Sequence, residues 1–290
     1  MICKLLVVML VVCMTASCAF EQSPTGYSKV WEDTFDGTSL DTSNWTIGCK
    51  DPGSGDLIAG AAGAYLLNTG YSGYITTDDV WVSDGSLYLQ NQKRKYTGTD
   101  PAGTYEYTTG WIMSMHKVHF NGGYLEMRAK YPSGNKVWPA FWLIAEDLVW
   151  GPEWDIFEYF GYRSDYGYDV MVTALATGKG PNVSWIANHI SDYNSTYDCH
   201  AWHVYGFEWT EDYAKWYIDG VEVYHIDNTI GNSWPNEEMY IVLNNGVHGN
   251  APEGKTTWPN HFIIDYIKLY KLLPTTCGDD KCGSGEDACN

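Results

Sequence analysis

Arginine is scarce in this chain of 290 residues, where Arg94, Arg128 and Arg163 are the only three. Lysine and arginine together number 17 against 36 aspartates and glutamates, so the formal net charge is −19. Nucleic acids and anionic membranes bind to basic patches, and neither is expected as a partner. Arginine also forms the forked contacts by which proteins recognise sulfate and carboxylate groups. An uncharged ligand therefore fits this composition better than an anionic one.

Long apolar runs are also missing. The longest, from Leu5 to Val12, is far shorter than the roughly 18–20 residues that span a bilayer. It follows Lys4 and precedes the small residues Ser17-Cys18-Ala19, which is the pattern of a secretory signal peptide over residues 1–19. We therefore expect an exported protein. Ala16-Ser17-Cys18 is also a loose match to a lipoprotein signal, so a lipid anchor on Cys18 is the alternative.

No cysteine pair has zinc-finger spacing with histidines nearby, which argues against a zinc site. Five cysteines remain after the predicted signal peptide: Cys49, Cys199, Cys277, Cys282 and Cys289. An oxidising compartment favours disulfides, but the number is odd and the sequence does not fix the pairing.

Helical periodicity is hard to find after the signal peptide. Short alternating runs recur instead, separated by clusters of Gly, Asp, Asn and Ser. In residues 124–130 the polar and apolar positions alternate, with Glu126 and Arg128 expected to form an ion pair on one face. Asp219-Gly220, between two such runs, predicts a tight hairpin. These patterns predict an all-β fold of two antiparallel sheets packed as a jelly-roll sandwich over residues 20–273.

After Pro274 the chain changes character. Residues 274–290 contain three cysteines and no large apolar side chain. We expect this segment to be a separate tail, similar to the start of a small cysteine-rich repeat, because it cannot dock by hydrophobic burial.

The six residues from Glu153 to Glu158 combine three carboxylates with Trp, Ile and Phe. The apolar and aromatic members favour a β-strand, on which Glu153 and Asp155 would share a face. Glu158 is an odd number of positions from Glu153 and would point the other way. A β-bulge at Ile156-Phe157 would bring all three carboxylates to one face.

Paired carboxylates on one face of a sheet are typical of glycosidic bond cleavage. A retaining glycosidase uses two carboxyl groups roughly 5–5.5 Å apart, one as nucleophile and one as acid/base. Neighbouring negative charge raises the pKa of one carboxyl group, so that it keeps a proton near neutral pH. The alternative is a strand with alternating solvent-facing acids.

The surrounding motifs resemble glycoside hydrolase family 16, which includes laminarinases, lichenases, agarases and carrageenases. The matching segments are Val137-Trp138-Pro139-Ala140-Phe141-Trp142-Leu143, Gly122 to Lys130, Glu158-Tyr159-Phe160-Gly161, Phe207-Glu208-Trp209-Thr210, Trp216 to Gly220 and Ile264 to Tyr270. The resemblance runs from about Val30 to Lys271. It implies a concanavalin A-like jelly roll and a retaining endo-β-glycanase acting on a neutral β-1,3- or mixed β-1,3/1,4-glucan.

The resemblance also implies roles for individual residues. Glu153 would be the nucleophile, Glu158 the acid/base, and Asp155 the residue that holds Glu153 and tunes its titration. Trp138 and Trp142 share a face of the expected strand with small Ala140 between them, so we expect a surface on which sugars stack. Trp111 replaces an arginine that is common in the family and is a further stacking candidate.

Catalysis of this kind requires no cofactor, but the resemblance implies a structural calcium at Asp265. That site usually has a second acidic residue where this chain has Thr34, a departure that counts against the calcium. We expect a monomer. An agarase- or carrageenase-type galactan hydrolase and a transglycosylase remain alternatives. So does a non-catalytic glucan-binding protein, although such proteins typically lack one or both of the glutamates that are present here.

Overall fold

The computed structural model describes residues 24–58, 73–248 and 254–273. The predicted signal peptide, Cys18 and the tail with Cys277, Cys282 and Cys289 lie outside the described residues. Within the described ranges, no helix is long and apolar enough to cross a membrane.

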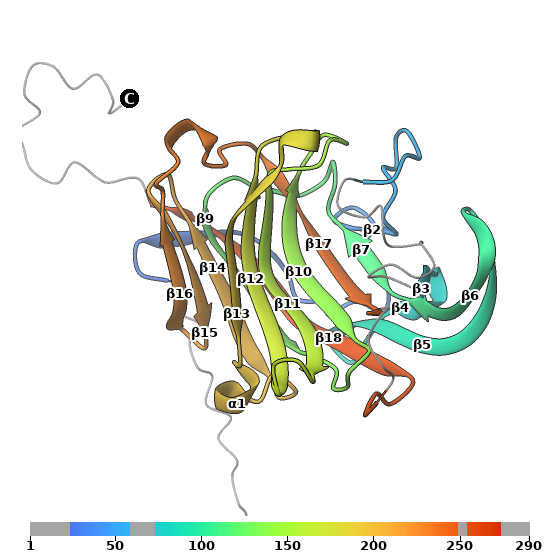
Figure 1. The fold of residues 1–290 in the computed structure, drawn as a ribbon. Helices are drawn as coiled ribbons and strands as arrows, with labels where there is room; N and C mark the ends of the chain where they lie inside the picture. Colours follow the sequence, from blue (N-terminus) through green and yellow to red (C-terminus); the bar gives the residue numbers. More distant parts are fainter. Residues whose placement is uncertain (1–23, 59–72, 249–253, 274–290) are drawn as a thin grey trace, which may run out of the picture.

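The described residues form two β-sheets that pack face to face (Figure 1), which confirms the predicted all-β sandwich. The first sheet contains, in order, β16 (Val221–Asp227), β15 (Tyr213–Ile218), β14 (His203–Trp209), β9 (Gly123–Lys130), β18 (Asn260–Leu272), β5 (Ser86–Thr99), β6 (Ala102–Thr109) and β3 (Gly73–Ile75), with β1 (Tyr27–Asp33) paired to β18 and β4 (Val80–Ser83) paired to β5. The second contains β13 (Ser184–Ser191), β12 (Tyr168–Thr177), β11 (Glu153–Arg163), β10 (Trp138–Ala145), β17 (Met239–Gly246), β7 (Trp111–Met113) and β2 (Thr46–Ile47), with β8 (His119–Phe120) paired to β17.

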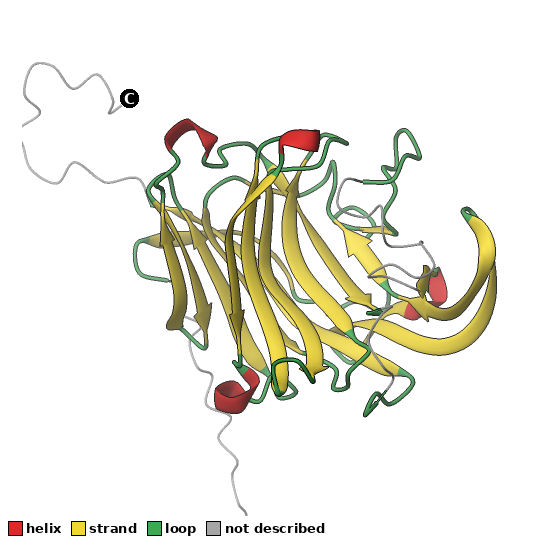
Figure 2. Ribbon diagram, in the orientation of Figure 1, coloured by secondary structure: helices red, strands yellow, loops and turns green. Residues whose placement is uncertain are grey.

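Nearly all of these pairings are antiparallel, as predicted, and the β3–β6 pair is parallel. The long β5–β6 hairpin curls away from the body of the sandwich (Figure 1). In the part of the chain that the structure describes, helical residues are confined to single turns between strands (Figure 2): α1 (Asn194–Tyr197) and the 3₁₀ turns η2 (Thr77–Asp79), η3 (Gly180–Asn182) and η4 (Gly231–Ser233).

The main hydrophobic core lies between the sheets and follows the alternation of the strands. Leu125, Met127 and Ala129 of β9 are fully buried there, together with Phe141 and Leu143 of β10. Burying one face of each strand fixes its register, because a shift by one residue would turn these side chains outward.

The turn predicted at Asp219-Gly220 is present, whereas the ion pair predicted between Glu126 and Arg128 is not. Asp219 and Gly220 form the predicted turn between β15 and β16, with φ angles of 51° and 76° that suit a tight hairpin. The expected ion pair between Glu126 and Arg128 is wrong. Glu126 is buried and accepts a hydrogen bond from the Tyr270 hydroxyl at 3.1 Å, whereas Arg128 contacts Asp265 at 2.5 Å.

Of the five cysteines considered above, two are described. Cys49 and Cys199 are both fully buried, and they belong to different hydrophobic clusters. Cys199 is a free thiol whose pKa is raised to about 12, mainly by burial.

Candidate active site

A β-bulge brings the three carboxylates of β11 to one face. In the pairing with β10, Phe157 lies opposite Phe141 and Asp155 lies opposite Trp142, so Ile156 is the extra residue. Ile156 and Phe157 both point into the main core, while Glu153, Asp155 and Glu158 line a pocket on the opposite face. The predicted bulge is therefore present at the predicted position.

Gly161 allows the loop between β9 and β10 to lie directly against β11. Gly161 follows the carboxylates on β11 and has a φ of +64°, and a Cβ there would lie 1.8 Å from the carbonyl oxygen of Gly134. Only glycine fits both the backbone conformation and the close approach. The loop between β9 and β10 is thus held against the end of the catalytic strand.

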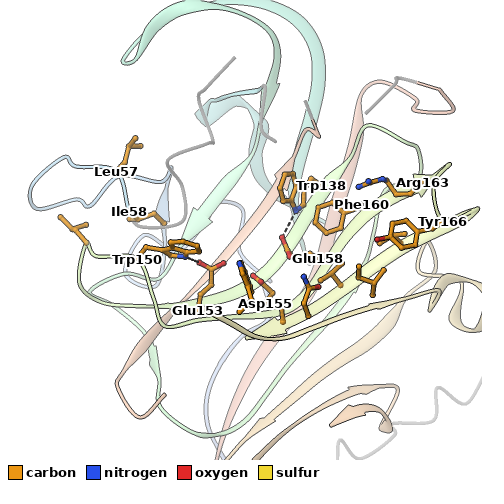
Figure 3. A pocket seen from close by; sticks show the side chains of 17 residues that line it. Leu57, Ile58, Trp138, Trp150, Glu153, Asp155, Glu158, Phe160, Arg163 and Tyr166 are labelled. Atoms are coloured by element: carbon orange, nitrogen blue, oxygen red, sulfur yellow. Dashed lines mark hydrogen bonds between the residues drawn. The ribbon is translucent and has the colours of Figure 1, made fainter. Parts of the chain in front are cut away.

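Two indole N–H groups hold the two glutamates (Figure 3). The Trp150 N–H donates to Oε2 of Glu153 at 2.7 Å, and the Trp138 N–H donates to Oε1 of Glu158 at 2.8 Å. Each glutamate therefore has a fixed orientation before any ligand binds. Trp138 comes from β10, whereas Trp150 lies in the loop that leads into β11.

Burial and mutual repulsion perturb the titration of all three carboxyl groups. Burial raises the pKa of Glu153 to about 7, opposed by hydrogen bonds from Trp150 and Asp155. Burial also raises the pKa of Glu158, to about 8, with the charge of Glu153 adding to the effect and the Trp138 bond opposing it. The pKa of Asp155 is raised well above its ordinary value by burial and by the charges of both glutamates. The ionised form of Asp155 is therefore disfavoured in its position beside the two glutamates.

The carboxylates line a pocket of about 780 Å³. It extends from Trp138 of β10 across β11 to β12 and β13, with Trp150 at the Glu153 end and Phe160 near Glu158 (Figure 3). A pocket of this size holds several sugar rings or an equivalent ligand.

The comparisons with known proteins agree with this geometry. A family model described as glycosyl hydrolases family 16 matches residues 68–268. The chain belongs to this family. Among characterised proteins, it is 31% identical over 267 residues to glucan endo-1,3-beta-glucosidase A1 of Niallia circulans, covering 85% of this chain and 38% of that protein. It is 27% identical to a glucan endo-1,3-beta-glucosidase of Cryptopygus antarcticus, covering 89% and 96%.

Solved structures give the same result for the fold. The endo-beta-1,3-glucanase of Pyrococcus furiosus matches with a TM-score of 0.69 at 23% identity, covering 85% of this chain and 95% of that one. The laminarinase of Flavobacterium sp. UMI-01 matches with a TM-score of 0.64 at 27% identity, covering 84% and 100%. Several relatives are much longer: the chain spans only 52% of the endo-1,3-1,4-beta-glycanase ExsH of Rhizobium meliloti. Within family 16, this chain is similar to the laminarinase and endo-β-1,3(4)-glucanase members.

Trp111 and Trp142, two of the tryptophans expected to bind substrate, lie outside the pocket of this family 16 chain. Trp111 and Trp142 are only 2% and 4% exposed and contact each other edge to face. They belong to a second cluster, on the outer face of the sheet, which also contains Ala140 and Ile58. Neither tryptophan lines the pocket, so the open surface expected around Ala140 is absent, and of the three tryptophans only Trp138 lines the pocket together with the carboxylates.

Other pocket residues were not among the site residues that the sequence predicted. Trp150 is the most important of these residues, because it lies three positions before Glu153 and its indole N–H donates to that carboxylate. The remaining newly found lining residues are Leu57, Ile58, Leu148, Phe160, Arg163, Tyr166, Val170, Val172, Ala174, Trp185, Asn188 and Ile190. Their types are common in any β-sandwich, so only the three-dimensional arrangement identifies them.

The residues around Asp265 do not fit the calcium that the family resemblance implies. One oxygen of Asp265 is paired with the Arg128 guanidinium at 2.5 Å, and the hydroxyl of Thr34 donates to Asp36 instead. In the described ranges, no group of three or more His, Cys, Asp or Glu side chains could hold a metal ion. A guanidinium neutralises the carboxylate that a calcium ion would need.

Proposed function

We propose that this protein is a retaining endo-β-glycanase that hydrolyses β-1,3- or mixed β-1,3/1,4-glucan by double displacement. The observation that supports this most strongly is the pair of oriented glutamates on one strand face. Glu153 and Glu158 are each fixed by an indole, and Asp155 lies between them.

In the first step, Glu153 attacks the anomeric carbon and forms a covalent glycosyl-enzyme. The hydrogen bond from the Trp150 indole, and after it the interaction with Asp155, lowers the pKa of Glu153 and so favours its ionised, nucleophilic form. Glu158, which keeps its proton to higher pH, gives that proton to the departing glycosidic oxygen. The two carboxyl groups thus differ in protonation because their surroundings differ.

In the second step, Glu158 acts as a base. It removes a proton from water, the water oxygen attacks the anomeric carbon, and Glu153 is released as a carboxylate. Two displacements at the same carbon give a product that retains the configuration of the substrate. A sugar hydroxyl in place of water would give transglycosylation by the same route.

A neutral polysaccharide suits the charges in the pocket. Arg163 is the one arginine among the lining residues, and its Nε and one terminal nitrogen donate to the Asp165 carboxylate at 3.2 and 3.0 Å. Its charge is thus already compensated within the protein. Since Arg163 is paired and Glu153 must be ionised to act as nucleophile, a sulfated or carboxylated glycan would find no compensating positive charge among the lining residues. The predicted leader at residues 1–19 adds the proposal that the enzyme acts outside the cell.

The test is an assay of laminarin, lichenan, agarose and κ-carrageenan, scored by newly formed reducing ends. We expect the first two to be hydrolysed at rates orders of magnitude above the two galactans. The Glu153→Gln variant should be inactive on all four while still binding laminarin. Preference for κ-carrageenan would contradict the charge argument, and binding without hydrolysis in the unmodified protein would indicate a non-catalytic glucan-binding protein.

A further inference from the structure

Three aromatic rings pack together at the Glu158 end of the pocket. The ring centroids of Trp138 and Phe160 are 4.7 Å apart, and the imidazole of His248 lies 5.3 Å from Trp138 and 5.9 Å from Phe160. Trp138 and Phe160 line the pocket (Figure 3), whereas His248 is not among the lining residues. His248 therefore supports the two lining rings from outside the pocket.

The pairing of β10 with β17 explains why His248 reaches this indole. Trp138 lies directly opposite Gly246, the last residue of β17. Glycine has no side chain to pack on an indole, so the diagonal neighbour two positions further along, on the same face, takes that place. That neighbour is His248, whose ring plane is 31° from the plane of the indole. The imidazole thus packs against Trp138 at a shallow tilt.

The indole of Trp138 orients the proposed acid/base. Its N–H donates to Oε1 of Glu158 at 2.8 Å, and this bond lowers the pKa of a carboxyl group whose pKa burial raises. A hydrogen bond weakens steeply as its donor turns away from the acceptor. A rotation of the indole therefore changes both the direction of the Glu158 carboxyl group and its affinity for a proton.

His248 is uncharged near neutral pH. It is partly buried, and burial, followed by the charges of Arg163 and Lys136, lowers its pKa, opposed by Asp165. A neutral imidazole packs on an indole as an aromatic ring without a net charge. A phenyl ring can therefore replace it in this contact.

We propose that His248 is a positioning residue for the acid/base: its ring holds the Trp138 indole at the angle at which the N–H bond to Glu158 forms. This inference rests on the proposed function and adds a residue that acts on the same site from outside the pocket. It involves no new chemical step. Glu158 gives and takes the proton as described above, and His248 acts on it through Trp138.

Loss of the imidazole should have part of the effect of losing the indole bond. A hydrogen bond to a charged group is worth about tenfold in rate and about one unit in the pKa of its acceptor. In His248→Ala the indole is still present but is held less firmly. We expect about half of the full effect on a logarithmic scale, so kcat should fall about threefold and the alkaline limb of the pH–rate profile should rise by about half a unit. KM should change little, because the pocket lining is intact.

The experiment measures kcat and KM on laminarin across the pH–rate profile. His248→Phe keeps a ring against the indole and should restore both the kcat and the alkaline limb of the unmodified protein. His261→Ala is the matched control, because His261 is also partly buried and contacts the rings of Trp81 and Tyr88 at 5.5 and 6.0 Å, away from the pocket lining. It should leave both quantities unchanged.

Combining Trp138→Phe with His248→Ala tests whether the effect passes through the indole. Once the indole N–H is absent, removing the imidazole should shift the alkaline limb no further than Trp138→Phe alone does. An additional shift as large as that of His248→Ala would overturn the inference. So would an unchanged profile in His248→Ala, or a fall in kcat that is not accompanied by a shift, since a merely structural role gives that result.

An NMR titration separates this inference from the proposed function, because it requires no turnover. The signal of the Glu158 carboxyl carbon, assigned with Glu158→Gln in glutamate-labelled protein, reports the protonation of that group. His248→Ala should move this titration to higher pH by about half a unit. If laminarin is hydrolysed and the titration does not move, only this inference fails. If no glucan is hydrolysed, the proposed function fails, and the titration alone decides the inference.

Discussion

Replacing Glu153 by Gln should make the protein more stable at alkaline pH while abolishing turnover. Glu153 is 8% exposed, and the pKa of its carboxyl group is raised from the ordinary 4.5 to about 7, chiefly by burial. A raised pKa means that the folded protein binds the proton more tightly than the unfolded chain does. The resulting stabilisation is fully present below about pH 4.5 and is lost as the pH rises through about 7.

The magnitude follows from the two pKa values. One pH unit of difference is worth about 1.4 kcal/mol, so this one carboxyl group lowers the free energy of unfolding by about 3 kcal/mol between pH 4 and pH 9. Glutamine has nearly the same shape and cannot ionise. Its side-chain oxygen can still accept the Trp150 N–H bond, which measures 2.7 Å in the unmodified protein. The variant and the unmodified protein should therefore have similar stability at pH 4.

The assay is urea unfolding followed by tryptophan fluorescence at pH 4, 5.5, 7 and 9. The free energy of unfolding of Glu153→Gln, relative to the unmodified protein, should grow by about 3 kcal/mol over that range. Glu106→Gln, which changes an exposed glutamate on β6, is the control and should show no such trend. A difference for Glu153→Gln that stays constant with pH would refute the argument that burial destabilises the ionised carboxylate.

Three further predictions concern single contacts. Trp138→Phe removes the 2.8 Å hydrogen bond that lowers the pKa of Glu158, so the alkaline limb of the pH–rate profile should move to higher pH. The kcat should fall about tenfold, as expected for a lost hydrogen bond to a charged group. An unchanged profile would mean that the bond does not affect Glu158. Gly161→Ala should destabilise the protein by about 2–4 kcal/mol, because its Cβ would lie 1.8 Å from the Gly134 carbonyl oxygen. Gly167→Ala, at a φ of +83° with open space around it, is the matched control and should cost about 1 kcal/mol; equal losses would show that the close approach is unimportant. Calcium and EDTA should leave the melting temperature unchanged, since Arg128 already neutralises Asp265; a calcium-dependent rise would contradict that.

The sequence by itself determined the parts of this protein that depend on neighbouring residues. Alternation along residues 124–130 predicts the buried face of β9, because successive side chains of a strand point in opposite directions. The same rule makes the bulge at Ile156 necessary if the three carboxylates are to lie together, and the structure has that bulge. Asp219-Gly220 specifies its turn through the positive φ angles that such a turn requires.

Only the tertiary structure decided which aromatic rings reach the pocket. Trp138 and Trp142 occupy the same face of β10, yet Trp138 lines the pocket and Trp142 is buried against Trp111. The strand pattern fixes the direction of each ring, but exposure depends on what other segments place over it. Here residues such as Ile58, distant in sequence, pack in the cluster that buries Trp142. The contact of Trp150 with Glu153 likewise depends on how a loop meets the neighbouring strand, because a tryptophan is equally suited to a core.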